Sequence, residues 1–224
     1  MNRIGSLVAA GILAGIAAPA YAADVIAPEP APQATAPAPK PVTDFLTLEA
    51  SPEWGAVSPY TYKDWYAKIG YSHVFANGLS WGASLQETFP KTGKTATQPE
   101  TTLGYKWKFA NLSFGLSGGV GYTTGTVGGH GANKGDTVGA YYLASASLDD
   151  KLSSKWTWNV INARYRNAFD ETWITPKVAT GLTYQIDPRQ SAYVSVGYAW
   201  KDTGDGNGLV ADKLNLALGY KVGF

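Results

Sequence analysis

Cysteine is absent from this 224-residue sequence, which excludes disulfide bridges, thiolate metal sites and cysteine nucleophiles. Charged residues are scarce: they make up 16% of the chain, whereas roughly 25% is usual in soluble proteins. The formal net charge of +1 leaves no overall field that would attract nucleic acid. Beyond the N-terminal region no run of about 20 apolar residues occurs, so the sequence predicts no transmembrane helix there. A chain without such a helix can still span a membrane if its strands close into a barrel.

Histidine is also rare, which limits the chemistry that the chain could catalyse. The two histidines are His73, at a predicted lipid-facing strand position, and His130, in the glycine-rich segment 128–131. General acid–base or nucleophilic catalysis requires a base held close to a nucleophile or an activated water. No Gly-x-Ser-x-Gly motif is present. We therefore predict that the protein is not an enzyme and has no catalytic residue, metal site or cofactor.

The N-terminal residues are typical of an export signal. Arg3 gives a positive start, residues 4–18 are apolar, and the small-x-small motif at 20–22 precedes a cleavage site. An uncleaved membrane anchor is the alternative, but the apolar run is short for a span and leads directly into the cleavage motif. We predict that residues 1–22 are a signal peptide and that the mature chain begins at Ala23.

Residues 23–43 differ in composition from the rest of the chain. Prolines interleaved with alanines run from Pro28 to Pro41. Such a sequence favours the extended polyproline conformation and cannot form a regular strand ladder. We interpret residues 23–43 as a Pro/Ala-rich periplasmic tether.

From residue 44 onward, apolar residues alternate with small or polar ones. Leu112, Phe114 and Leu116, for example, alternate with serine and glycine. Alternation over about ten residues is typical of membrane-barrel strands. A soluble β-sandwich or lipocalin-like barrel also alternates, but its outer face carries charged residues, whereas the second face here is mostly Gly, Ser, Thr and Ala. We therefore predict an all-β fold, a transmembrane antiparallel up-and-down barrel over residues 44–224.

The breaks in this alternation predict a barrel of ten strands. Their predicted ranges are 44–54, 65–75, 79–90, 99–110, 112–125, 137–150, 154–169, 176–187, 190–202 and 211–224. Short connections alternate with longer ones, as in outer-membrane barrels with the short side in the periplasm, and an even strand number places the tether and the C-terminus there too. Pro52 and Glu53 weaken the first strand; if it is not a strand, the alternative is an eight-stranded barrel.

The predicted strand 154–169 carries two arginines that the simple alternation would turn toward lipid. An arginine at mid-bilayer on a barrel costs roughly 2–4 kcal/mol. A bulge near Val160 or Ile161 would reset the alternation and turn both Arg164 and Arg166 toward the lumen. We predict that bulge, or an extension of this strand beyond the membrane.

Basic residues dominate the positions expected to face the lumen. Ten strands about 4.8 Å apart and tilted by about 40° give a backbone radius on the order of 10 Å, and small inward residues leave room for water. The lumen-lining candidates are Lys106, Lys108, Arg164, Arg166, Lys201, Lys213 and Glu49. As alternatives, the lysines lie at the rims near water or lipopolysaccharide, or side chains such as Tyr66 and Tyr141 plug the bore.

The last strand resembles a known assembly signal. Apolar residues occupy alternate positions from Leu214 to Phe224. This pattern resembles the C-terminal signal of bacterial outer-membrane proteins, which the barrel-assembly machinery recognises, and the resemblance assigns that role to Tyr220, Val222 and Phe224. The class usually has an aromatic residue two positions before the final Phe, where this chain has Val222, so the match is incomplete.

The Pro-rich start, the single barrel and the terminal Phe are together similar to the small porin-like surface proteins of alphaproteobacteria. That resemblance implies membrane integrity, passive permeation, or surface adhesion and ligand uptake, with outer-membrane lipid and lipopolysaccharide as partners. We predict a narrow porin-like channel for small polar or anionic solutes, or a structural envelope protein, in the outer membrane of a Gram-negative bacterium. The alternative is a surface binding or adhesion protein that works through the loops 91–98, 126–136 and 203–210.

Overall fold

The computed structural model describes four parts of the chain, residues 42–124, 139–170, 173–202 and 208–224. The predicted signal peptide lies outside the described residues, as do the loop at 126–136 and all but the end of the predicted tether. Within the described parts, no helix is long and apolar enough to cross a membrane.

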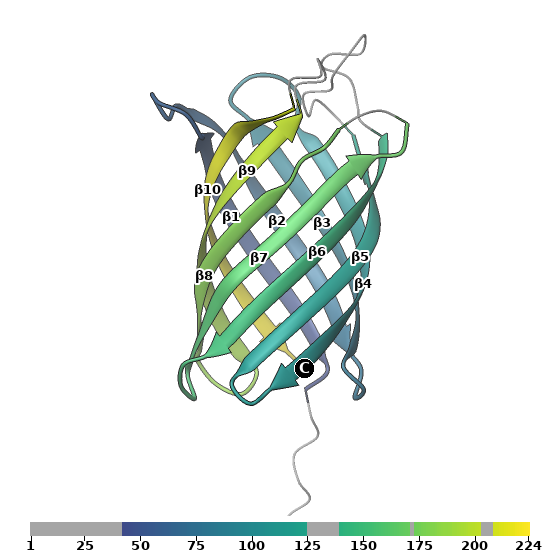
Figure 1. Cartoon of the computed structure of the whole chain (residues 1–224), viewed down its shortest axis with the longest axis vertical. Helices are drawn as coiled ribbons and strands as arrows, with labels where there is room; N and C mark the ends of the chain where they lie inside the picture. Colours follow the sequence, from purple (N-terminus) through teal and green to yellow (C-terminus); the bar gives the residue numbers. More distant parts are fainter. Residues whose placement is uncertain (1–41, 125–138, 171–172, 203–207) are drawn as a thin grey trace, which may run out of the picture. The chain divides into compact units, whose positions relative to one another are not determined.

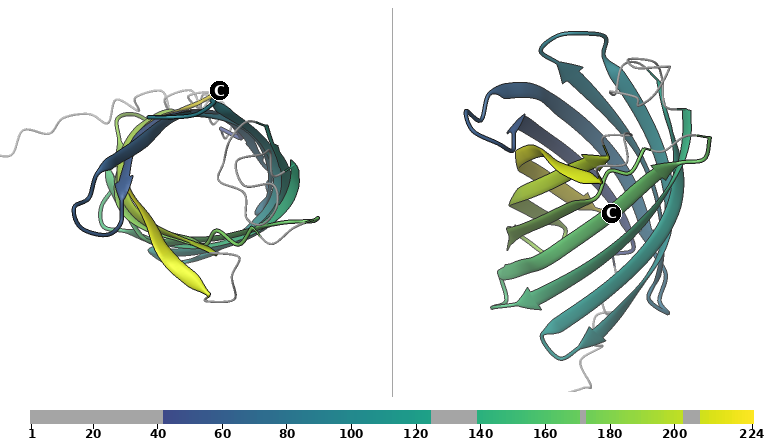
Figure 2. Two further views of the ribbon diagram at one scale, coloured as in Figure 1. Left: turned by 90° about the horizontal axis from the view of Figure 1, so that it is seen from above. Right: turned by 45° about the horizontal axis from the view of Figure 1, so that its top comes forward.

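Ten antiparallel strands form a closed barrel, as the sequence predicts (Figure 1). The strands are β1 (Asp44–Gly55), β2 (Tyr62–Val74), β3 (Leu79–Pro90), β4 (Ala96–Phe109), β5 (Leu112–Thr123), β6 (Gly139–Lys151), β7 (Trp156–Ala168), β8 (Lys177–Gln185), β9 (Gln190–Asp202) and β10 (Leu209–Gly223). Each strand pairs with its neighbours in sequence, and β1 closes the barrel against β10. The end-on view in Figure 2 shows the strands as one continuous ring.

The first segment is a strand although Pro52 and Glu53 interrupt its pattern. β1 pairs on one side with β2 and on the other with β10. Pro52 has no N–H to donate, and the ladder with β10 is interrupted only between Ala50 and Glu53. A register shift between Glu53 and Trp54 in the β2 ladder absorbs the remaining irregularity. The eight-stranded alternative is therefore wrong.

The short turns lie at the end of the barrel where the C-terminus lies (Figure 1). Asn77 starts the turn between β2 and β3, because its Oδ1 accepts a 3.0 Å hydrogen bond from the N–H of Leu79. Gly78 follows with a φ of 91°, a conformation that favours glycine. Between β8 and β9, Asp187 Oδ1 accepts hydrogen bonds of 2.7 and 2.8 Å from the N–H groups of Arg189 and Gln190. Local side chains thus fix the register of both hairpins.

The polarity of the wall is inverted relative to that of a soluble protein. Large apolar side chains point outward and remain exposed, including Leu103 at 55%, Val196 at 53% and Leu218 at 59%. Inward positions hold buried polar groups, including Arg166 at 4% and Asn215 at 3% exposure. Water would disfavour so large an exposed apolar surface. The wall is therefore built to face hydrocarbon.

Aromatic side chains pair on the outer face near the strand ends. Trp65 and Phe89 stack with ring centroids 4.3 Å apart at the loop end of β2 and β3. At the opposite end, the Trp107 ring lies 4.7 Å from that of Tyr105 and 5.6 Å from that of Phe114. Amphipathic rings at both ends of an apolar band are the arrangement expected at the two membrane interfaces.

β7 contains the bulge that the sequence predicts near Val160. The pairing of β7 with β8 shifts register between Asn159 and Asn162, and its pairing with β6 shifts at the same level. Val160 is therefore the one extra residue relative to both neighbours. The bulge turns Arg164 and Arg166 into the lumen, where both line the internal cavity.

The contact of the wall with lipid can be tested at Leu116, which lies in the middle of β5 and is 46% exposed. We expect Leu116→Arg to lower the free energy of unfolding in lipid vesicles by about 2–4 kcal/mol, because the arginine would enter hydrocarbon. On a water-facing surface the same change would stay within about 0.5 kcal/mol. Urea titration of the refolded protein measures the difference.

The matched control for Leu116→Arg is Leu152→Arg. Leu152 is 56% exposed but lies in the short turn between β6 and β7, outside the apolar band. We expect this variant to unfold like the parent protein. Equal effects of the two arginines would contradict the lipid-facing assignment of β5.

Candidate functional site: the barrel lumen

A polar cavity of about 800 Å³ lies inside the barrel, and side chains from all ten strands line it. The cations in its lining are Lys68, Arg164, Arg166, Lys177, Lys201 and Lys213. The carboxylates are Glu49, Glu53, Asp64, Glu100 and Asp212. Among the described residues the lining thus carries only one positive charge in excess, less than the sequence indicated.

The loop end of the cavity holds cations that carboxylates neutralise closely. Lys213 Nζ lies 2.7 Å from Glu53 Oε2 and 2.7 Å from Asp64 Oδ2. Lys201 Nζ lies 3.5 Å from Asp212 Oδ1. Since β10 and β2 flank β1 in the wall, the Lys213 cluster joins three adjacent strands on their inner face. These ion pairs leave little free charge at this end.

Glu100 of β4 joins strands of the wall that are not neighbours. Its carboxylate forms an ion pair with Arg166 of β7, although β5 and β6 separate the two strands. It also lies 3.8 Å from Lys68 Nζ and accepts a 2.9 Å hydrogen bond from the hydroxyl of Tyr141. The side chains of Glu100 and Arg166 are only 8% and 5% exposed. This bridge narrows the bore.

Glu49 is held by two tyrosines instead of by a cation. The hydroxyl of Tyr66 donates a 2.7 Å hydrogen bond to Glu49 Oε1, and the hydroxyl of Tyr193 donates to Oε2. Tyr193 belongs to β9 and reaches β1 over the inner face of β10. Gly219 of β10 makes this possible, because a Cβ at that position would clash with the Tyr193 ring.

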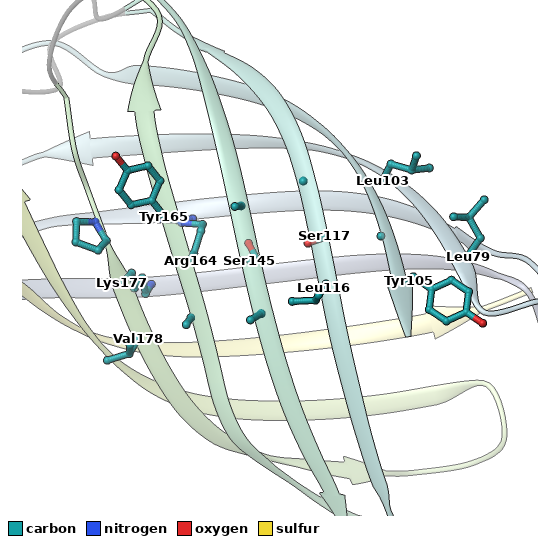
Figure 3. Close-up of a pocket in the computed structure, with 16 residues that line it drawn as sticks. Leu79, Leu103, Tyr105, Leu116, Ser117, Ser145, Arg164, Tyr165, Lys177 and Val178 are labelled. Carbon is teal, nitrogen blue, oxygen red and sulfur yellow. The ribbon is translucent and has the colours of Figure 1, made fainter. Parts of the chain in front are cut away.

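Arg164 and Lys177 differ from the other cations of the cavity. They are direct register partners on β7 and β8, and Figure 3 shows them side by side, with Tyr165 and Val178 next to them in the chain. Among the described residues, neither has a carboxylate oxygen within 4.0 Å. Lys177 Nζ lies 5.7 Å from the centroid of the Tyr66 ring. The Nε of Arg164 is buried and has no hydrogen-bond partner.

The outer face of this part of the wall carries a groove of about 730 Å³ (Figure 3). Leu103, Leu116 and Val178 line it, and so do Arg164 and Lys177, which also line the cavity of the lumen. Its apolar lining suits the lipid-facing side of the barrel. The groove therefore belongs to the membrane surface and not to the lumen.

Most of the predicted lumen-lining residues line the cavity, and two do not. The cavity contains Arg164, Arg166, Lys201, Lys213 and Glu49. Lys106 and Lys108 lie beyond it, at the short-turn end of β4. Lys106 Nζ forms a 2.6 Å ion pair with Asp149 Oδ2 there. Both lysines thus lie near the rim of the barrel, the alternative that the sequence analysis gave for them.

Sequence reasoning missed three carboxylates of the lining. Glu100 shares the inward parity of Lys106 on the same strand, so the alternation alone could have found it. Asp64 lies outside the predicted strand, which begins at residue 65, whereas β2 begins at Tyr62. The position of Asp212 in the lining depends on a register shift between Ala211 and Lys213. No pattern in the sequence indicates that shift.

The C-terminal residues complete the closure of the barrel. Val222 pairs with Leu46 of β1 and with Gln190 of β9. The N–H of Phe224 donates a 3.0 Å hydrogen bond to the carbonyl oxygen of Asp44, while its ring is 63% exposed on the outside. Tyr220, Val222 and Phe224 thus present an apolar outer edge. Their recognition by the barrel-assembly machinery stays a prediction.

The described histidine lies away from the cavity. His73 Nδ1 is 2.8 Å from Asp44 Oδ1, near the short-turn end of the barrel, and His130 lies outside the described residues. Within the described parts, no group of three or more His, Cys, Asp or Glu side chains is placed to hold a metal ion. Of the loops considered for surface binding, 126–136 and most of 203–210 also lie outside these parts.

Comparison with known proteins gives the fold but no relative in sequence. The chain matches no protein-family model and no curated protein sequence. An outer-membrane channel from Pseudomonas putida F1 has a similar structure, with a TM-score of 0.51, 11% identity and coverage of 84% of this chain and 97% of that one. The NanC porin gives a TM-score of 0.49 at 11% identity, covering 79% of this chain and 98% of that one. Ail, the attachment invasion locus protein of Yersinia pestis, gives 0.37 at 10% identity, covering 83% and 100%.

The first of these likenesses shows a shared barrel architecture. Together with the closed ten-stranded sheet and the apolar outer band, it gives the chain the fold of the small bacterial outer-membrane β-barrels.

Proposed function

We propose that this protein is a narrow outer-membrane channel for small polar solutes that favours anions. The observation that carries the proposal is a polar cavity of about 800 Å³ inside a barrel whose outer wall is apolar. Water and small solutes fit such a space, whereas a packed interior would serve only to hold the wall together. In this proposal the short turns face the periplasm, and outer-membrane lipid and lipopolysaccharide surround the wall.

The preference for anions follows from how the charges of the lumen are paired. Carboxylates neutralise most of the cations, but Arg164 and Lys177 have no such partner among the described residues. Glu49 accepts two tyrosine hydroxyls and keeps its negative charge, but it forms no ion pair with either cation. A narrow bore with low-dielectric walls strengthens the field of an unpaired charge. The mid-lumen therefore attracts anions more strongly than the overall charge of the lining suggests.

Planar-bilayer recording tests the channel. The refolded protein should give discrete conductance steps, and under a KCl gradient the reversal potential should show chloride to be more permeant than potassium. A correctly folded barrel that gives no steps would overturn the channel and favour the purely structural role in the envelope. Folding is checked separately, because a closed barrel resists unfolding in detergent until it is heated.

The double variant Arg164→Gln plus Lys177→Gln tests the origin of the selectivity. We expect it to keep its conductance steps while the chloride-to-potassium permeability ratio falls by several-fold, since only carboxylate-paired cations remain in the cavity. Lys106→Gln is the matched control, because it removes a positive charge that lies outside the cavity. An equal loss of selectivity in the control would show that charge anywhere along the lumen suffices.

A further inference from the structure

The cations of the cavity divide into two groups by their partners. Lys68 and Arg166 share Glu100, Lys201 pairs with Asp212, and Lys213 pairs with both Glu53 and Asp64. Arg164 and Lys177 alone among the cations of this lining have no carboxylate within 4.0 Å in the described residues. Each carboxylate of the lining is meanwhile engaged elsewhere. The positive charge that lacks a close carboxylate is therefore concentrated at one place in the wall.

The pairing of β7 with β8 places the two cations next to each other. As register partners on adjacent strands, Arg164 and Lys177 have Cβ atoms about 4.5–5.5 Å apart. Like charges placed directly opposite each other destabilise a sheet. A bound anion between the two cations would offset this repulsion. Gly197 lies on β9, the other neighbour of β8. It leaves room for the side chain of Lys177, since a Cβ on Gly197 would lie 2.8 Å from Lys177 Cε.

Two polar side-chain atoms of β7 and of the segment before β8 have no hydrogen-bond partner in the described residues. The Nε of Arg164 and the Oγ1 of Thr175 are both buried without a hydrogen-bond partner. Thr175 lines the cavity and is tied to β7, because its N–H donates a 3.0 Å hydrogen bond to the carbonyl oxygen of Arg166. Buried polar groups without partners are uncommon in folded proteins. The guanidinium of Arg164 and the ammonium of Lys177 both line the cavity, so they are the groups that an anion would meet on this side of the lumen.

From this arrangement we infer that Arg164 and Lys177 form a binding site for an oxyanion, the carboxylate or phosphate group of a small solute. A guanidinium binds two oxygens of such a group side by side, and an ammonium adds a point charge and further donors. The inference rests on the proposed channel and deepens it: anions pass through the lumen by way of one saturable site and not only through a diffuse field.

Calorimetric titration of the refolded wild-type barrel in detergent measures this binding without reference to conductance. The probes are inorganic phosphate and sodium acetate, each in a low-chloride buffer. We expect saturable binding with one site per chain for at least one probe; tighter binding of phosphate would identify phosphate-bearing solutes, and tighter binding of acetate carboxylate-bearing ones. No saturable heat with either probe overturns the inference.

Three variants separate the site from the general charge of the lumen. Arg164→Gln and Lys177→Gln should each weaken binding by about tenfold to a hundredfold, the range for losing a hydrogen bond to a charged group. Arg164→Lys keeps the charge but loses the paired donors, so it should retain anion selectivity in bilayers yet bind the probe at least several-fold more weakly. Lys201→Gln is the matched control in the same cavity and should bind like the parent. Equal weakening by Lys201→Gln would overturn the site.

Calorimetry and bilayer recording together distinguish a failure of the proposed site from a failure of the proposed channel. Conductance steps with chloride preference but no saturable binding would leave the channel standing and remove the site. Binding at Arg164 and Lys177 in a barrel that gives no conductance steps would remove the channel and leave a binding protein, which contradicts the inference as a permeation site.

Discussion

Replacing Glu100 by glutamine should open the lumen and destabilise the barrel in the same variant. Glu100 is the carboxylate that Arg166 and Lys68 share and that Tyr141 hydrogen-bonds. Glutamine keeps the shape but leaves two cations without a countercharge, and breaking a buried ion pair on one side typically costs about 3–5 kcal/mol. Urea titration in lipid vesicles measures this loss in the free energy of unfolding.

The same substitution should raise both conductance and anion selectivity. The excess positive charge of the lining rises by one when Glu100 is neutralised, and the side chain of Arg166 is no longer held across the bore. Single-channel recording should therefore show larger steps and a chloride-to-potassium permeability ratio several-fold above that of the parent. A smaller or unchanged conductance would mean that the bridge between β4 and β7 does not limit passage.

Glu53→Gln is the matched control for this experiment. It removes the same charge from the same cavity, but Lys213 keeps Asp64 as a partner at 2.7 Å. We expect a smaller loss of stability and little change in step size, because no bridge across the lumen is broken. If the two variants behave alike, the number of carboxylates in the lumen determines stability and step size, and the position of Glu100 does not.

The strands could be predicted from the sequence because each carries its own alternation. A lipid-facing wall demands an apolar residue at every second position, so the pattern is local and survives without knowledge of the partner strands. The prediction was least accurate where a strand leaves the apolar band. β2 begins at Tyr62 and not at the predicted residue 65, because two consecutive charged residues, Lys63 and Asp64, interrupt the alternation there.

The pairing inside the lumen could not be predicted in the same way. Alternation tells which residues face inward; it placed Lys213 in the lumen, and together with the predicted bulge it placed Arg166 there. It does not tell which side chains meet across the bore, because that depends on the height of each residue on a tilted strand. The bridge from Glu100 to Arg166 and the hold of Tyr193 on Glu49 join strands that are not neighbours. The isolation of Arg164 and Lys177 follows only once those partners are known.

The bulge in β7 leads to a prediction with an all-or-none outcome. Val160 is the extra residue of β7 relative to both β6 and β8. Deleting it leaves Asn159 facing inward and Ile161 facing outward, as they do now, so the alternation becomes regular and Arg164 still points into the lumen. We therefore expect the Val160 deletion to fold and to keep its anion selectivity, with a modest change in stability.

The control is a deletion of Gly118 in β5, where the ladders with β4 and β6 contain no bulge. Removing a residue from a regular strand shifts all that follow to the opposite face, so Val120 and Tyr122 would turn into the lumen. Gly121 would turn outward, and the Tyr141 ring would lose its close contact with this glycine. We expect this deletion to abolish folding into vesicles, scored by the loss of the heat-modifiable band on a gel. Since both variants lose one residue from mid-strand, a Val160 deletion that fails as completely would show that the bulge is required for more than setting which way the arginines of β7 point.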